Sequence, residues 1–149
     1  MSKKLKSKTQ PVGEISPNRY RELLNNTRLL EISVISFNSF IIRDKFPLKD
    51  NLSIKISDNY SFTFSKNIVK AIASLELNVP IDNSNESIIL IKVDYEVNIE
   101  IKGEIPSEFW NIYKSLTLPL QIWPYFREFV QNTTSRMNIP PLTLPVLFK

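Results

Sequence analysis

The chain has 149 residues, enough for one domain with its own core, and 42% of them are hydrophobic while 23% are charged. These proportions are typical of a folded protein, and no apolar run approaches the roughly 18 residues that a membrane span needs. Without histidine or cysteine the chain lacks the side chains for most metal sites, thiol nucleophiles and Ser-His pairs. Its two glycines are too few for a glycine-rich phosphate loop. We therefore expect neither an enzyme nor a bound cofactor.

The net charge of +4 comes entirely from the N-terminus, where four lysines lie at positions 3, 4, 6 and 8. The remaining basic side chains balance the 15 acidic ones. A basic arm can contact phosphate groups, but a solvated tail is the simpler interpretation. We expect residues 1–14 to be a disordered tail, with neither nucleic acid nor membrane as partner. The absence of cysteine is consistent with a cytoplasmic protein without disulfides.

A short helix and a long strand are predicted in the first third of the chain. Ser16 can cap a helix that begins at Pro17. Its apolar stripe has the spacing i, i+3, i+4, i+7 and consists of Tyr20, Leu23, Leu24 and Thr27. Residues 29–43 are rich in β-formers, and their apolar positions change parity between Val34 and Phe37. This change predicts a bulge.

Two further strands are predicted from alternation. Residues 52–57 alternate apolar and polar, and the strand continues over residues 60–64 after a predicted turn at Asp58-Asn59. Within residues 68–81 the alternation is clear only from Leu75 to Ile81. We expect the third strand there, ended by residues 82–86.

The fourth strand, Ile89 to Ile101, has an apolar residue at every odd position. One whole face of it must be covered by other parts of the chain, by copies of the chain or by clients. The other face carries Asp94, Glu96 and Glu100. Such a row can supply acid–base carboxylates, but the solvated side of an antiparallel strand explains it more simply.

The period changes to that of helices after Gly103. Ser107 can cap a short helix whose apolar residues are Phe109, Trp110, Ile112 and Tyr113. We expect an apolar link over residues 116–122, then a helix from Pro124 to about Arg136 whose inner stripe is Phe126, Phe129, Val130 and Thr133. Residues 139–148 contain three prolines and are predicted to be extended.

Three motifs near the C-terminus carry a resemblance. The segment Trp123-Pro-Tyr-Phe-Arg-Glu-Phe-Val is followed by Ser135-Arg136 and then by Pro140-Pro-Leu-Thr-Leu-Pro. This order resembles the helix and following segment of the export chaperone SecB. The Pro-Pro-Leu-Thr-Leu motif and the amphipathic segment 20–30 are similar to the corresponding segments of the SecB-like chaperones encoded with toxin–antitoxin pairs.

The resemblance implies an α+β fold: one SecB-like domain over residues 1–149, with a four-stranded antiparallel sheet, a short N-terminal helix and a long C-terminal helix. It implies an ATP-independent holdase that assembles as a homotetramer, a dimer of dimers. Its clients would be unfolded segments held in apolar grooves, and the antitoxin is the first candidate. The alternatives are a general chaperone for exported preproteins and an oligomeric scaffold without clients. Docking to the translocase motor is doubtful, because the body of this chain is neutral whereas the export chaperone is acidic.

Candidate client-binding residues come from two sources. The position of the helix motif suggests Leu120, Ile122, Trp123, Tyr125, Phe126 and Phe129. The faces of the predicted strands add a groove floor made of Ile35, Phe37, Phe40, Leu52, Ile54 and Ile56. Arg127 and Glu128 match the family's charged pair and are expected to orient the helix or to contact another subunit.

Overall fold

The computed structural model describes residues 14–45, 53–81 and 85–147, so nearly all of the predicted N-terminal tail lies outside the described residues. The elements in chain order are α1 (Pro17–Leu24), β1 (Thr27–Ile41), the short 3₁₀ turn η1 (Arg43–Lys45), β2 (Lys55–Phe64), β3 (Ile68–Pro80), β4 (Ser87–Ile101), α2 (Ser107–Ile112), the π-helical turn η2 (Tyr113–Thr117) and α3 (Leu118–Arg136). None of the helices in these ranges combines the length and hydropathy that crossing a bilayer requires.

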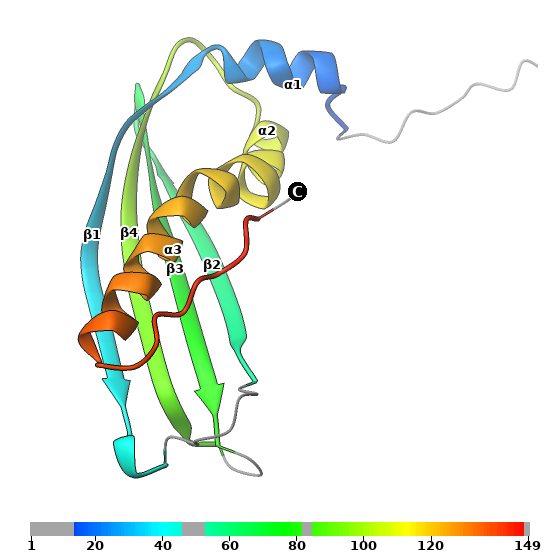
Figure 1. Cartoon of the computed structure of the whole chain (residues 1–149). Helices are drawn as coiled ribbons and strands as arrows, with labels where there is room; N and C mark the ends of the chain where they lie inside the picture. The colour runs from blue at the N-terminus through cyan, green and yellow to red at the C-terminus, as the bar shows by residue number, and fades with distance from the viewer. Residues whose placement is uncertain (1–13, 46–52, 82–84, 148–149) are drawn as a thin grey trace, which may run out of the picture.

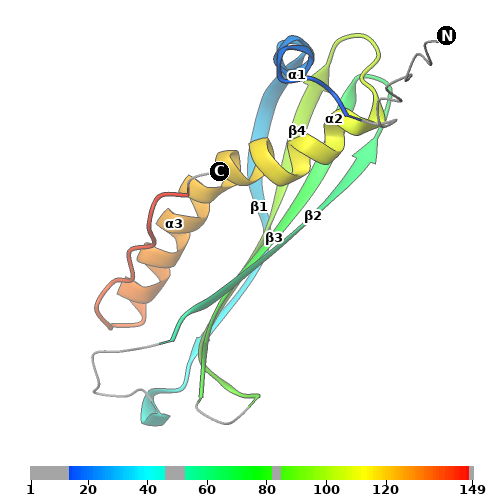
Figure 2. The same cartoon turned by 90° about the vertical axis from the view of Figure 1, so that its right-hand side faces the viewer.

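The four strands form one antiparallel sheet with the order β1-β4-β3-β2. The helices lie on one face of this sheet, and α3 runs obliquely across it (Figures 1 and 2). Among the described residues, no helix lies on the other face (Figures 1 and 2). The predicted fold class, a four-stranded antiparallel sheet packed with a long C-terminal helix and a short N-terminal one, is confirmed.

The core lies between the helices and the two central strands. In β4 the odd-numbered residues from Ile89 to Ile99 are buried, and so are the odd-numbered residues from Val69 to Val79 in β3. Facing them, α3 presents a stripe with a spacing of four residues, made of Leu118, Ile122, Phe126, Val130 and Thr134. The helices of one chain therefore cover the apolar face of β4 from Ile89 to Ile99, while Ile101 is partly buried, so this cover comes from the chain itself and not from a second copy of the sheet.

Strand β1 contains two irregularities in its pairing with β4. The register shifts between Leu29 and Glu31 and again between Val34 and Ser36, and the second shift confirms the bulge predicted from the change of parity. Leu30 and Ile35 are the extra residues. Each bulge returns apolar side chains to the helix side of the sheet, so that Val34 and Phe37 both lie opposite buried residues of β4.

The predicted turn at Asp58-Asn59 is wrong, because β2 runs through both residues without a register shift. Both are exposed on an edge strand, where their low β-propensity costs little, while the buried Tyr60 packs into the core. The third strand also begins earlier than expected, at Ile68. Its first half was obscured by alanines, which are weak β-formers.

The helix α3 begins at Leu118 and not at Pro124, so the predicted apolar link over residues 116–122 is wrong. Pro124 lies inside the helix and has no N–H to donate to the carbonyl of Leu120, which is why the sequence suggests a helix start there. Burial of Leu118 and Ile122 against the sheet outweighs this local loss. Pro119, near the first turn, causes no conflict.

The chain reverses direction directly after α3. Asn138 has a positive φ of 57°, a conformation that asparagine tolerates better than most residues. A guanidinium N–H of Arg43 donates to the carbonyl of Met137 and ties this end of α3 to the segment after β1. Residues 139–147, which we call the C-terminal tail, then run back along α3 in extended form (Figure 1).

We expect Phe126→Ala to lower the free energy of unfolding by about 3–5 kcal/mol, because the ring is fully buried beneath α3 and its removal leaves a cavity. Urea denaturation at fixed protein concentration measures this change. Tyr125→Ala is the matched control, because Tyr125 is next to Phe126 in the sequence but is 47% exposed. It should lower the free energy of unfolding by less than about 1 kcal/mol. Equal losses for the two variants would contradict the described packing of α3.

Alkaline pH should destabilise the fold. Burial is the largest cause of the raised pKa of Tyr20, Tyr60, Tyr95 and Tyr113, and the pKa of Tyr113 rises to about 12 from an ordinary value of 10.0. The folded chain therefore keeps phenolic protons that the unfolded chain releases above pH 10, so stability is full below this pH and is lost as the pH rises towards 12. Urea titrations across this range should give a falling free energy of unfolding; a constant value would contradict the burial of these hydroxyls.

Candidate functional site

The face of the sheet without helices is polar, and its three β4 carboxylates each have a partner. The Ser36 hydroxyl donates to Asp94 at 2.7 Å, Lys70 Nζ lies 3.4 Å from Glu96, and Arg28 Nε lies 3.0 Å from Glu100. Hydrogen bonds from Ser74 and Ser36 hold the pKa of Asp94 below its ordinary value. Within the described residues, no group of three or more acidic side chains is arranged to hold a metal ion.

Apolar side chains are instead exposed on the helix side, at both edges of the sheet. At the first edge, β1 exposes Leu29, Val34 and Phe37 on this side, and the bulge residue Ile35, next to Val34, is exposed as well; we call these four residues the β1 edge surface. Phe37 is 66% exposed although it is a large apolar residue. Its ring meets that of Phe129 on α3 edge-to-face, with the ring centroids 5.7 Å apart.

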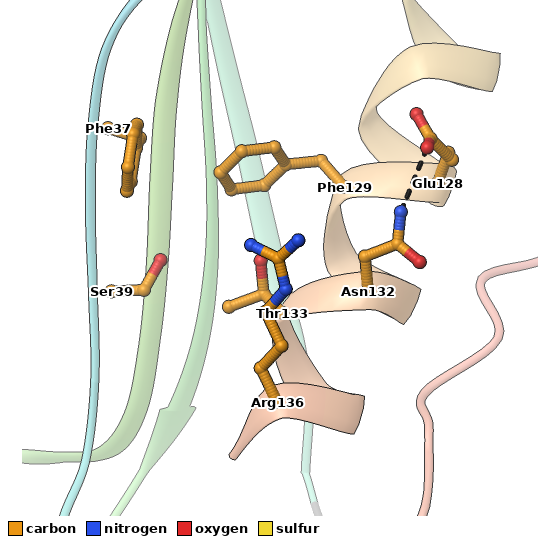
Figure 3. A pocket seen from close by; sticks show the side chains of 7 residues that line it. All are labelled: Phe37, Ser39, Glu128, Phe129, Asn132, Thr133 and Arg136. Atoms are coloured by element: carbon orange, nitrogen blue, oxygen red, sulfur yellow. Dashed lines mark hydrogen bonds between the residues drawn. The ribbon is translucent and has the colours of Figure 1, made fainter.

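A pocket of about 320 Å³ opens between β1 and α3 at this contact (Figure 3). The rings of Phe37 and Phe129 form its apolar wall, and the guanidinium of Arg136 points into it. The hydroxyl of Ser39, also in its lining, is buried and has no hydrogen-bond partner among the residues that the structure describes. Such a pocket can receive an apolar side chain and satisfy a polar group beside it. The sequence marked Arg136 only as half of the Ser135-Arg136 motif.

The second edge of the sheet carries an aromatic cluster that the sequence reasoning missed. Phe64 at the end of β2 is 57% exposed, and its ring lies 5.6 Å from that of Trp110 on α2. The ring centroid of Phe62 lies 5.4 Å from that of Trp110 and 6.4 Å from that of Tyr113. The exposed Phe64, Ile54 and Ile56 form what we call the β2 edge surface, and the buried Trp110 and Tyr113 support it from below. The alternation of residues 60–64 was the available signal, because it puts three aromatic rings on one face of a strand.

The structure divides the predicted client-binding residues among several places. Ile35 and Phe37 lie at the β1 edge, Ile54 and Ile56 at the β2 edge, and Leu120 and Tyr125 on exposed positions of α3. Because β4 and β3 separate β1 from β2, these strand residues do not form one continuous groove floor, as had been expected. Leu52 lies outside the described residues.

Three other predicted client-binding residues lie away from both edge surfaces. Ile122 and Phe126 are fully buried on the sheet-facing stripe of α3, so they are core residues and no part of an accessible surface. Phe40 is exposed, but it pairs with Leu90 and so lies on the polar face of the sheet, away from the helices. Phe129, by contrast, is half-buried and lines the pocket next to Phe37.

Trp123 and Arg127 hold the C-terminal tail against α3. Trp123 Nε1 donates to the carbonyl of Pro145 at 2.7 Å, and Arg127 Nε donates to the carbonyl of Leu144 at 2.7 Å. Glu128 instead faces the β1–α3 pocket, where it accepts a hydrogen bond from Asn132 at 2.8 Å, and its charge adds to the burial that raises the pKa of Tyr95. In this structure Arg127 therefore positions the tail, while Glu128 lines the pocket.

No protein-family model matches the sequence, and neither does any curated protein. Among solved structures, a SecB-like chaperone of Mycobacterium tuberculosis, in complex with a ChAD peptide from the HigA1 antitoxin, superposes with a TM-score of 0.71. The match covers 87% of this chain and 93% of that one, at 19% sequence identity. The chain has the SecB-like fold. A Streptococcus agalactiae protein of unknown function matches at 11% identity over 80% of this chain and 96% of its own, with a TM-score of 0.49.

On this SecB-like fold, Trp123→Phe should loosen the C-terminal tail while leaving the core in place. The substitution keeps the aromatic ring but removes the hydrogen bond to Pro145, which is worth about 0.5–1.5 kcal/mol. We expect the amide of Leu142, which donates to Thr134, to exchange up to about tenfold faster, as measured by hydrogen-exchange mass spectrometry. Trp110→Phe is the control, because Trp110 lies on α2 and does not contact the tail in the described hydrogen bonds. If Trp123→Phe leaves the exchange rate of the Leu142 amide unchanged, the described anchoring is contradicted.

Proposed function

We propose that the protein is an ATP-independent chaperone of the holdase type, which binds extended apolar segments of an unfolded client. The first candidate client is the antitoxin of a toxin–antitoxin pair. The observation that carries the proposal is the exposure of large apolar side chains at both edges of the helix-covered face, Phe37 and Phe64 above all. Large apolar side chains gathered at an exposed edge are a common mark of an interaction site.

The geometry of the two edges suits an extended peptide. β1 and β2 are edge strands in the described sheet, so each has backbone N–H and C=O groups available for pairing with an added strand. The apolar rings stand beside these groups and can supply side-chain contacts. The likeness to a SecB-like chaperone in complex with an antitoxin peptide supports the antitoxin as client, since that complex joins the same fold to the same class of ligand.

The ion pairs of Glu96 and Glu100 favour an antitoxin client over an export role. Lys70 and Arg28 offset the charges of these two carboxylates, which leaves Asp94, bonded to hydroxyls, as the β4 carboxylate outside these ion pairs. We keep a general chaperone for exported preproteins as the alternative client class. In both readings we propose a homotetramer, to be measured by analytical ultracentrifugation.

The test is suppression of the aggregation of α-lactalbumin after reduction, a reaction to which this cysteine-free chain is itself inert. We expect Phe37→Ser to weaken suppression by about tenfold or more, because one well-placed aromatic ring commonly carries a large share of the binding energy. Phe40→Ser is the matched control: it changes the same residue type on the same strand, but on the polar face. Equal behaviour of the two variants would place client binding elsewhere.

Co-purification from the native host separates the three functional readings. One small partner encoded beside the gene supports the antitoxin client, and a range of unfolded proteins supports the general chaperone. A stable oligomer that neither suppresses aggregation nor co-purifies with a client would establish the scaffold instead and overturn the proposal.

A further inference from the structure

The C-terminal tail is held on α3 without secondary structure of its own. Residues 139–147 run antiparallel to the helix on its outer side (Figures 1 and 2). Within the described residues, the last backbone–backbone hydrogen bond of this segment is the one from Ile139 to Thr134. The main chain beyond it depends on side chains of α3 for its hydrogen bonds.

Three side chains of α3 supply these bonds from one face of the helix. Thr134 Oγ1 accepts from the amide of Leu142 at 3.0 Å, and Arg127 and Trp123 donate to the consecutive carbonyls of Leu144 and Pro145. Thr134 is itself fully buried. All three hydrogen bonds are made to main-chain groups of the tail and not to its side chains. Another segment with the same extended backbone can therefore make them too.

The tail contributes one buried apolar anchor, and Ile139 and Leu142 are partly buried against the core. Leu144 is only 4% exposed and joins the core cluster, whereas Val146, two residues later, is 54% exposed. An open cavity of about 180 Å³ remains beside the tail, with Arg127 and Gln131 of α3 on one side and Thr143 and Leu144 on the other. A segment held by one buried side chain, two partly buried ones and three hydrogen bonds beside a cavity is one that a similar segment can replace.

We propose that this face of α3 is a peptide-binding site, which the chain's own tail fills as a self-ligand. Its other occupant is a client segment of the tail's chemistry: extended, apolar, with a leucine side chain for the buried site of Leu144 and a following proline. The inference rests on the proposed holdase function and adds to it a second contact site and an internal competitor. Because the tail is tethered, it competes at a local concentration on the order of millimolar. A client segment therefore occupies the site only when its affinity and concentration together outcompete the tail.

The probe is a fluorescent peptide with the tail's own sequence, residues 139–147, added to the full-length protein. We expect the wild type to bind it weakly and Leu144→Asp to bind it about tenfold or more tightly, because the charge expels the internal tail and frees the site. Val146→Asp is the matched control, since it puts the same charge on the same tail at an exposed position, and it should behave as the wild type. A labelled peptide with serine in place of its anchoring leucine should not bind to either variant.

A second measurement needs no variant of the tail. In the wild type, the indole N–H resonance of Trp123 reports the bond to Pro145, and that of Trp110 serves as an internal reference. We expect both the unlabelled tail peptide in excess and reduced α-lactalbumin to shift the Trp123 signal. Failure of Leu144→Asp to gain peptide affinity while its fold is intact, or a Trp123 signal that does not move while the client is held, would overturn the inference.

The two proposals fail in different ways. If the wild type does not suppress aggregation but Leu144→Asp still gains affinity for the tail peptide, the peptide site stands and the holdase function falls. If suppression is strong and equal in the wild type and Leu144→Asp, and the Trp123 resonance is unmoved by reduced α-lactalbumin, the holdase function stands and the site on α3 is not used by clients.

Discussion

The packing of α3 against the two central strands is the contact on which the rest of the molecule depends. Its buried stripe, spaced every four residues from Leu118 to Thr134, lies over the odd-numbered faces of β3 and β4. The small side chains of Ala71 and Ala73 leave space on β3 for larger neighbours. Ala73 is paired with Tyr60 on β2 and with Tyr95 on β4. Because this contact lies within one chain, the apolar face of β4 needs no partner for its burial.

The same contact explains why apolar surface remains exposed at the edges. A helix with its side chains is about 10–12 Å across, whereas four strands spaced about 4.8 Å apart are wider than this by at least one strand. A single oblique helix can therefore bury the two middle strands but not both outer ones. Phe37 on β1 and Phe64 on β2 lie on the helix side of the sheet and are nevertheless exposed. The surfaces proposed to bind clients follow from this difference in width.

The outer side of α3 has a different character from its sheet-facing side. The inner stripe is apolar except for Thr134, while the outer side uses Trp123 and Arg127 to bind carbonyl groups of an extended segment. Thr134 belongs to both sides: it is buried, and its hydroxyl accepts a hydrogen bond from the tail. One helix thus holds the core together and also presents a site for extended backbone.

The sequence by itself determined the features that follow from local periodicity: the helix starting at Pro17, the bulge near Ile35, the strict alternation of β4 and the antiparallel sheet. It also placed Phe37 and Phe129 among the candidate site residues, and these two do meet. Only the tertiary structure decided that α3 begins at Leu118, that Ile122 and Phe126 are buried, and that the β1 and β2 surfaces are separate. The physical reason is that chemically similar apolar residues differ in burial only through strand order and the width of the covering helix, and neither property is local to a stretch of sequence.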